Sequence, residues 1–163
     1  MKKYIKVYDN VLPEEHCKTL IDKFELNKDQ QVSTDLENHR HFTEININQH
    51  VDWKSMVDGL YTTLRPYVER YKKDCNIKDK QWPDKFGFEQ IRFKRYLPND
   101  KDEFKEHVDV GDYASARRFL VFFLFYFITY CTVNKLASDS DSLNVSEFKH
   151  NVSNCRLCTL VLV

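Results

Sequence analysis

The stretch IRFKRYLPNDKDEFKEHVDV, residues 91–110, decides how this chain is interpreted. It contains the end of an alternating apolar and charged run (86–96) that predicts a strand, a polar turn-forming loop (97–103), and then His107 and Asp109 in FKEHVDV. Side chains two residues apart on a strand point to the same face, so this imidazole and carboxylate can converge on one ion. An H-x-D tripeptide also arises by chance, and by itself it favours an ordinary surface pair.

The rest of the first 126 residues predicts a mixed α+β fold. The expected elements are a short strand at 4–8, a helix that begins near Pro13, a polar loop at 27–41, a strand at 42–48 and a helical apolar stripe at 52–73. The strand at 42–48 has Phe42, Glu44 and Asn46 on one side. Pro66 interrupts the stripe, which predicts either a kink or two helices that meet there.

The other histidines of the first half do not suggest a metal site. His39, His41 and His50 flank the strand at 42–48, but none has a carboxylate at a ligand-like spacing on a regular element. We therefore expect them to lie in solvated loops.

Composition limits the classes of partner. The 163 residues predict one domain, and 25 basic residues cancel 25 acidic ones, which disfavours nucleic acid and anionic lipid. No secretory signal is visible, so we expect a cytoplasmic protein whose cysteines are free thiols. The apolar run 119–133 is short for a membrane helix and rich in aromatic and β-branched residues, which favours a buried strand over a membrane span.

A family resemblance changes how the His-x-Asp tripeptide is interpreted. The segment EQIRFKRYLPNDKDEFKEHVDVGDYASARRFLVFFLFY, residues 89–126, resembles the Fe(II)- and 2-oxoglutarate-dependent oxygenases of the prolyl 4-hydroxylase-like group. The phrase NVLPEEHCKTLIDKFE, residues 10–25, is similar to the opening of the first helix in that family. The resemblance covers roughly residues 1–126.

The resemblance implies a double-stranded β-helix, or jelly roll, with N-terminal helices, whose core would be incomplete at the C-terminus. It implies that His107 and Asp109 are catalytic iron ligands and that Tyr96 contacts 2-oxoglutarate, with Arg92 and Gln90 on the same strand as further candidates. The implied cofactors are Fe(II) and 2-oxoglutarate, with ascorbate as an additional reductant. The implied reaction consumes O2 and hydroxylates a protein side chain or a small molecule, and releases succinate and CO2.

The resemblance ends at Tyr126. Residues 127–163 contain six charged residues against 44 in the first 126, and no glycine follows Gly111. The family's Gly-Gly-x-Thr segment, distal histidine and following basic residue are not visible, and His150 is the one histidine after Asp109 and so the one candidate for a third ligand on that side. We interpret 1–126 as the helices and first half of the barrel, and 127–163 as an atypical tail produced by a frameshift, alternative splice or truncation. Loss of the distal ligand and the basic residue would weaken binding of iron and 2-oxoglutarate, and an inactive form stays an open alternative.

Two other interpretations stay open. His150, Cys155, Cys158 and Cys131 predict a small zinc-binding or interaction module, since Cys-x-x-Cys is a zinc half-site. The uncharged aromatic run that begins at Phe119 is also typical of a membrane-tethered or aggregation-prone fragment.

Overall fold

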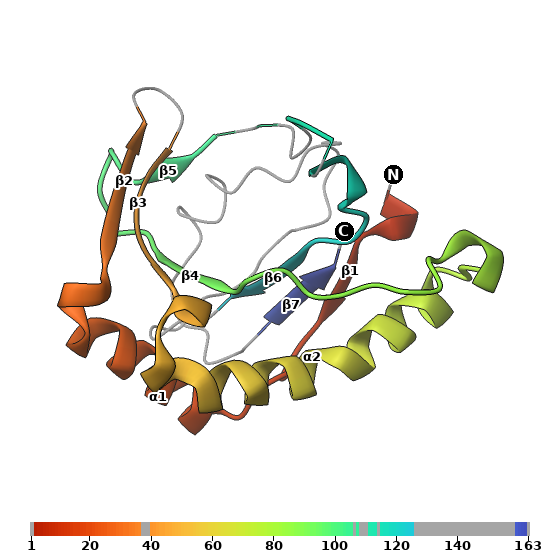
Figure 1. Ribbon diagram of the computed structural model, residues 1–163, viewed down its shortest axis with the longest axis horizontal. Coiled ribbons are helices and arrows are strands. Elements are labelled where there is room, and N and C mark those ends of the chain that lie inside the picture. Colours follow the sequence, from red (N-terminus) through yellow and green to blue (C-terminus); the bar gives the residue numbers. More distant parts are fainter. Residues whose placement is uncertain are drawn as a thin grey trace.

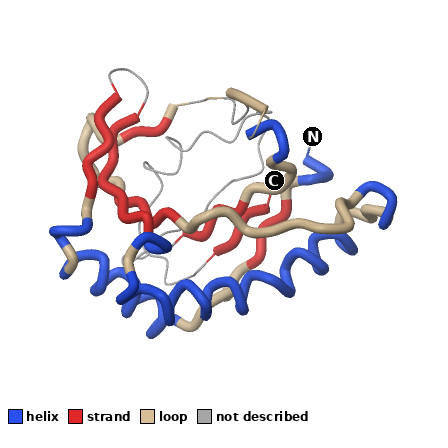
Figure 2. The backbone as a smooth tube through the Cα atoms, viewed as in Figure 1, coloured by secondary structure: helices blue, strands red, loops and turns tan. Residues whose placement is uncertain are grey.

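The computed structural model describes residues 2–36, 40–105, 107, 111–113, 115–125 and 159–162. Two α-helices run along one side of the molecule, and two antiparallel sheets lie on the other (Figures 1 and 2). The mixed α+β class predicted from the sequence is confirmed.

The helices are α1, Glu14–Leu26, and α2, Lys54–Asp74. Pro13 is the N-cap of α1, and Glu14 and Glu15 occupy its first turn, where the helix dipole favours negative charge. Helix α2 continues through Pro66, so the alternative of two helices that meet there is wrong. The buried stripe on both sides of Pro66, which includes Leu64 and Val68, holds the helix together across the missing backbone donor.

One sheet has the strand order β1-β7-β6. It contains β1 (Lys6–Tyr8), β7 (Thr159–Leu162) and β6 (Phe122–Phe125). Strand β7 pairs antiparallel with both neighbours, so residues from the atypical tail supply the central strand of this sheet. The two ends of the described chain therefore lie near each other (Figure 1).

The other sheet has the order β2-β3-β4, with β5 also paired to β3. Its strands are β2 (Val32–Leu36), β3 (Arg40–Asn46), β4 (Arg92–Arg95) and β5 (Glu103–Phe104), and short 3₁₀ helices occupy Lys2–Tyr4, Lys28–Gln30, Ile47–Gln49, Val51–Trp53, Asp79–Gln81 and Ser115–Arg117.

Three sequence predictions for this sheet need correction. The polar loop expected at 27–41 contains strand β2, because pairing with β3 along its length outweighs a weak local signal. The strand expected at 86–96 is reduced to β4, and β5 ends at Phe104, so His107 lies outside a strand.

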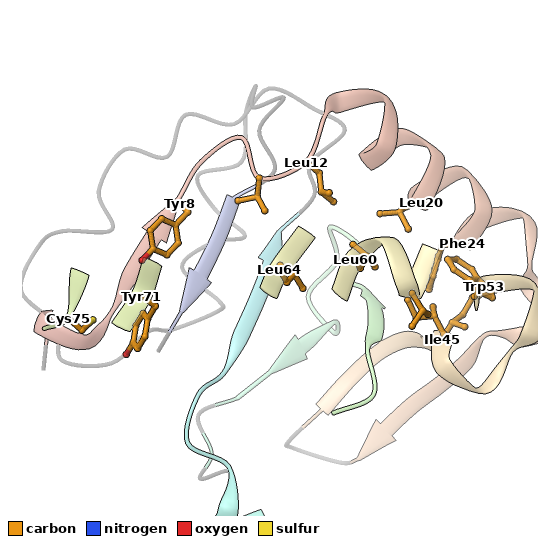
Figure 3. Packing of buried hydrophobic residues seen from close by; sticks show 13 residues of the cluster. Tyr8, Leu12, Leu20, Phe24, Ile45, Trp53, Leu60, Leu64, Tyr71 and Cys75 are labelled. Atoms are coloured by element: carbon orange, nitrogen blue, oxygen red, sulfur yellow. The ribbon is translucent and has the colours of Figure 1, made fainter. Parts of the chain in front are cut away.

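The hydrophobic core lies between the helices and both sheets (Figure 3). Trp53, Phe24, Ile45 and Ile47 are at most 1% exposed. The Trp53 indole N–H donates to Gln30 Oε1 at 2.7 Å, so this large ring is buried without an unpaired donor. Within the described residues, no helix is both long and apolar enough to span a membrane.

Candidate active site

The β2-β3-β4 sheet has two faces of different character. One face packs on α1, since Phe93 contacts the Phe24 ring at 5.1 Å between centroids and Arg95 Nη1 donates to Glu25 Oε2 at 2.6 Å. Because side chains alternate along a strand, Phe42, Glu44 and Asn46 of β3 and Arg92, Lys94 and the following Tyr96 lie on the opposite face. We call this the distal face. It contains Arg92 and Tyr96, which the family resemblance suggests as cosubstrate contacts.

An aromatic and cationic cluster covers one end of the distal face. The Phe42 ring, 3% exposed, lies 5.4 Å from the Tyr96 ring and 5.7 Å from the Phe104 ring. Lys94 Nζ lies 4.4 Å from the Phe42 centroid and 4.5 Å from the Phe104 centroid, and Arg40 stacks over Phe104 at 4.8 Å. The rings attract these cations through their π-faces and position the charges on the sheet surface.

The Tyr96 hydroxyl stays protonated at neutral pH. Burial is the main cause that raises the pKa of Tyr96 to about 12, and the Glu44 carboxylate adds to it, while Arg40 opposes it. A neutral phenol can donate a hydrogen bond, so Tyr96 suits an acceptor such as a ligand carboxylate.

Glu44 and Asn46 form the polar part of the distal face. Arg92 Nη1 donates to Glu44 Oε1 at 2.8 Å, and Lys94 is the cross-strand neighbour of Glu44. Asn46 Nδ2 donates to Gln90 Oε1 at 2.8 Å. The other polar atom of each side chain, Glu44 Oε2 and Asn46 Oδ1, is an acceptor that is buried without a hydrogen-bond partner in the structure as described. An unsatisfied buried acceptor is costly, which makes this pair a feature that needs an explanation.

A tightly bonded loop joins Tyr96 to β5. Asp102, 3% exposed, accepts hydrogen bonds from the Leu97 N–H at 2.7 Å, from Asn99 Nδ2 at 3.0 Å and from His41 Nδ1 at 2.9 Å. Burial alone would raise the pKa of Asp102, but these three hydrogen bonds outweigh it and lower the pKa below its ordinary value.

The hydrogen bond from His41 to Asp102 shows that the prediction for His41 was wrong. The sequence places it in a solvated loop without a carboxylate partner, whereas it lies in β3 and bonds to a carboxylate 61 residues away. His50 follows a 3₁₀ helix and is half-buried, and His39 lies outside the described residues.

His107 lies beside the aromatic cluster of the distal face. Its ring is 4.2 Å from the Phe104 ring, and its Nδ1 lies 2.9 Å from the Lys105 carbonyl oxygen. A carbonyl only accepts, so Nδ1 carries the proton and Nε2 carries the lone pair of the neutral ring. Metal-binding histidines commonly have this arrangement, because a backbone carbonyl that binds one nitrogen orients the other.

His107 is the one predicted metal ligand among the described residues. Asp109, His150, Cys131, Cys155 and Cys158 lie outside the described residues. Within the described part of the chain, no three His, Cys, Asp or Glu side chains gather into a metal site.

Sequence reasoning missed Lys94, Glu44 and Asp102. Alternation in 42–48 and 86–96 places Lys94 and Glu44 correctly on faces, but it does not reveal that the strands are neighbours. Asp102 is one of many acids in a charged loop, so no local signal distinguishes it.

Two shallow hollows lie elsewhere on the described surface. One, of about 220 Å³, is lined by residues that include Tyr4, Cys75 and Gln81, and the other, of about 280 Å³, by residues that include His50, Asp58 and Tyr61.

Comparisons of the chain with family models, with curated proteins and with solved structures found no match.

Proposed function

We propose that this chain is a domain of an Fe(II)- and 2-oxoglutarate-dependent dioxygenase of the prolyl 4-hydroxylase-like type, which hydroxylates a protein side chain or a small molecule. One observation carries the proposal. Tyr96 and the cations Arg92 and Lys94 share the distal face of one sheet, and His107 contacts Phe104 of the same cluster. Residues that the resemblance assigns to cosubstrate and metal thus come together through Phe42 and Phe104.

The proposed architecture is a jelly roll. Two antiparallel sheets, with the sequence-distant strands β1, β7 and β6 adjacent in one of them, fit a barrel whose first and last strands meet. Helices on one side and the ligand-bearing face on the other would put the site at the barrel interior.

The described residues fit the implied metal in part. His107 Nε2 would be one ligand, and Asp109 and His150 are the proposed others. When bound, Fe(II) and 2-oxoglutarate with O2 supply the oxidation that converts a C–H bond to C–OH, and they release succinate and CO2. Ascorbate is proposed as a reductant that maintains activity.

The chain's own residues have separate tasks in this proposal. The Tyr96 hydroxyl donates a hydrogen bond to a 2-oxoglutarate carboxylate. The Lys94 ammonium supplies the positive charge that the resemblance expects from the tail, where no matching basic residue is visible. Phe42 and Phe104 exclude water and strengthen both interactions.

The test is turnover of 2-oxoglutarate without a prime substrate. The purified full chain, loaded anaerobically with Fe(II), 2-oxoglutarate and ascorbate and then exposed to air, should form succinate, with ascorbate supplying the two electrons that a prime substrate would otherwise provide. His107→Ala and Asp109→Ala should abolish it, while His16→Ala, a change of an exposed α1 residue, should leave it intact. Loss of succinate in the control as well, or turnover that survives both ligand variants, would contradict the proposal.

The same preparation tests the zinc alternative. Metal analysis after purification should find iron that depends on His107. Tight zinc that depends on Cys155 and Cys158 would instead support a zinc-binding module.

A further inference from the structure

The distal face has two buried acceptors, Glu44 Oε2 and Asn46 Oδ1, to which the proposed function assigns no role. They belong to residues two apart on β3, so both point from the same face, and the residue spacing is about 7 Å. Each atom has lost water without gaining a donor from the described chain. A site built this way favours a ligand that supplies the missing donors and rejects one that cannot.

The charges around the two acceptors select the kind of donor. The Glu44 carboxylate already binds Arg92 at 2.8 Å, and Lys94 is its cross-strand neighbour. A cationic ligand such as an ammonium or a guanidinium would meet these two positive side chains. A neutral N–H donor avoids that repulsion and still satisfies both oxygens.

The acceptors are within reach of a ligand on the distal face. The Glu44 side chain is 13% exposed, and Asn46 is half-buried. The terminal torsions of Glu and Asn are broad, so the carboxylate of Glu44 and the carboxamide of Asn46 can turn toward a ligand.

We propose that Glu44 and Asn46 form a subsite for neutral amide N–H groups of the prime substrate. This inference rests on the proposed function, and it narrows the substrate to amide-bearing molecules. A neutral amide N–H group can belong to a peptide backbone or to a side-chain carboxamide. An extended peptide repeats its N–H groups on one side every second residue, at the same spacing as Glu44 and Asn46 along β3.

The test is a titration followed by ¹⁵N NMR of the full chain, without iron or 2-oxoglutarate. The probes are N-acetyl-triglycine N-methylamide, acetamide, and N,N-dimethylacetamide, which has no N–H. The signal is the side-chain amide of Asn46, identified by its loss in Asn46→Asp. The first two probes should shift it saturably, and the third should not. If the triglycine amide binds more tightly than acetamide, the subsite recognises a peptide backbone. If the two bind equally per amide group, it recognises a side-chain carboxamide.

Glu44→Gln inverts the polarity of the subsite. Arg92 only donates, so the new carbonyl oxygen should face Arg92 and the new NH₂ should replace Oε2. Loss of one hydrogen bond should weaken binding of the triglycine amide roughly threefold to tenfold. Glu103→Gln, on β5 and opposite His41 rather than on the distal face, is the matched control and should bind as the wild type does.

A second pair of variants, at Asn46, tests the subsite if Glu44→Gln does not fold. Asn46→Asp keeps the acceptor oxygen and should retain saturation transfer to the N-methyl group of the triglycine amide, whereas Asn46→Leu should lose it. The proposal is overturned if dimethylacetamide shifts Asn46 equally, if no probe shifts it, or if Glu44→Gln binds as tightly as wild type. Because this assay contains no cosubstrate, its failure is distinct from a failure of succinate formation.

Discussion

Replacement of Asp102 by Asn should destabilise the chain and loosen the proposed site. The carboxylate is 3% exposed and accepts hydrogen bonds from Leu97, Asn99 and His41. A hydrogen bond to a charged group contributes about 1.5–3 kcal/mol, but here the donors are partly exposed and can regain water. We therefore expect Asp102→Asn to lower the free energy of unfolding by roughly 2–4 kcal/mol in total. For a chain of this size, that corresponds to a fall in Tm of about 4–16 °C.

The stability that Asp102 contributes should depend on pH, and the direction of its pKa shift sets the direction of that dependence. The pKa of Asp102 is below its ordinary value of 3.8 in the folded chain, so the unfolded chain binds the proton more readily. The stabilisation of the folded chain by the Asp102 carboxylate is fully present above pH 3.8. It is lost as the pH falls through the lower pKa that Asp102 has in the folded chain. The difference in unfolding free energy between wild type and Asp102→Asn should therefore shrink as the pH falls below 3.8.

Urea denaturation followed by circular dichroism, at neutral pH and at several acidic pH values, measures this difference. Asp100→Asn, an exposed acid of the same loop, is the control and should change stability by less than about 0.5 kcal/mol. Equal destabilisation by both variants, or a difference that grows as the pH falls below 3.8, would refute the reasoning.

Three further predictions concern the site and the tail. Lys94→Gln should weaken the binding of 2-oxoglutarate about tenfold, measured by calorimetry, and should leave the binding of 2-oxobutyrate, which lacks the distal carboxylate, unchanged. Equal loss of affinity for both ligands would exclude Lys94 as the residue that binds the distal carboxylate. Tyr96→Phe should remove one phenol that ionises near pH 12 from an ultraviolet titration and weaken 2-oxoglutarate severalfold, whereas an unchanged high-pH titration would contradict the burial of Tyr96. Deletion of residues 159–163 should leave β1 and β6 without their shared partner and cause aggregation detectable by light scattering, and a monomeric, cooperatively folding product would disprove the role of β7.

Local patterns predicted the helices well. The start of α1 at Pro13 with two acids, and the apolar stripe of α2, are strong signals because capping and helical periodicity act within a few residues. The face assignment within 42–48 is confirmed, since Ile45 is fully buried in the core while Glu44 and Asn46 lie on the other face. Of the two outcomes predicted at Pro66, a kink or two helices that meet, the second did not occur, because burial of the surrounding stripe outweighs one lost hydrogen bond.

The weaker predictions failed where pairing between distant segments decides the structure. Strand β2 is polar and exposed, and it exists because β3 is beside it. His107, which the sequence analysis treats as a strand residue, lies outside a strand, and β5 ends at Phe104, which pairs with Arg40. Neither outcome is encoded within a short window, since the hydrogen bonds come from residues tens of positions away.

The sequence by itself determined the two helices and the α+β class, whereas the candidate residues His107, Asp109, Tyr96 and Arg92 stay predictions that rest on the family resemblance. Periodicity and residue chemistry are local properties, so they can be read along the chain. Only the tertiary structure decided that Lys94 lies beside Glu44, that Asp102 bonds to His41, and that two acceptors of β3 are buried without donors. These features depend on the register between β3 and β4 and on the loop that follows, and register is set by the packing of both faces at once.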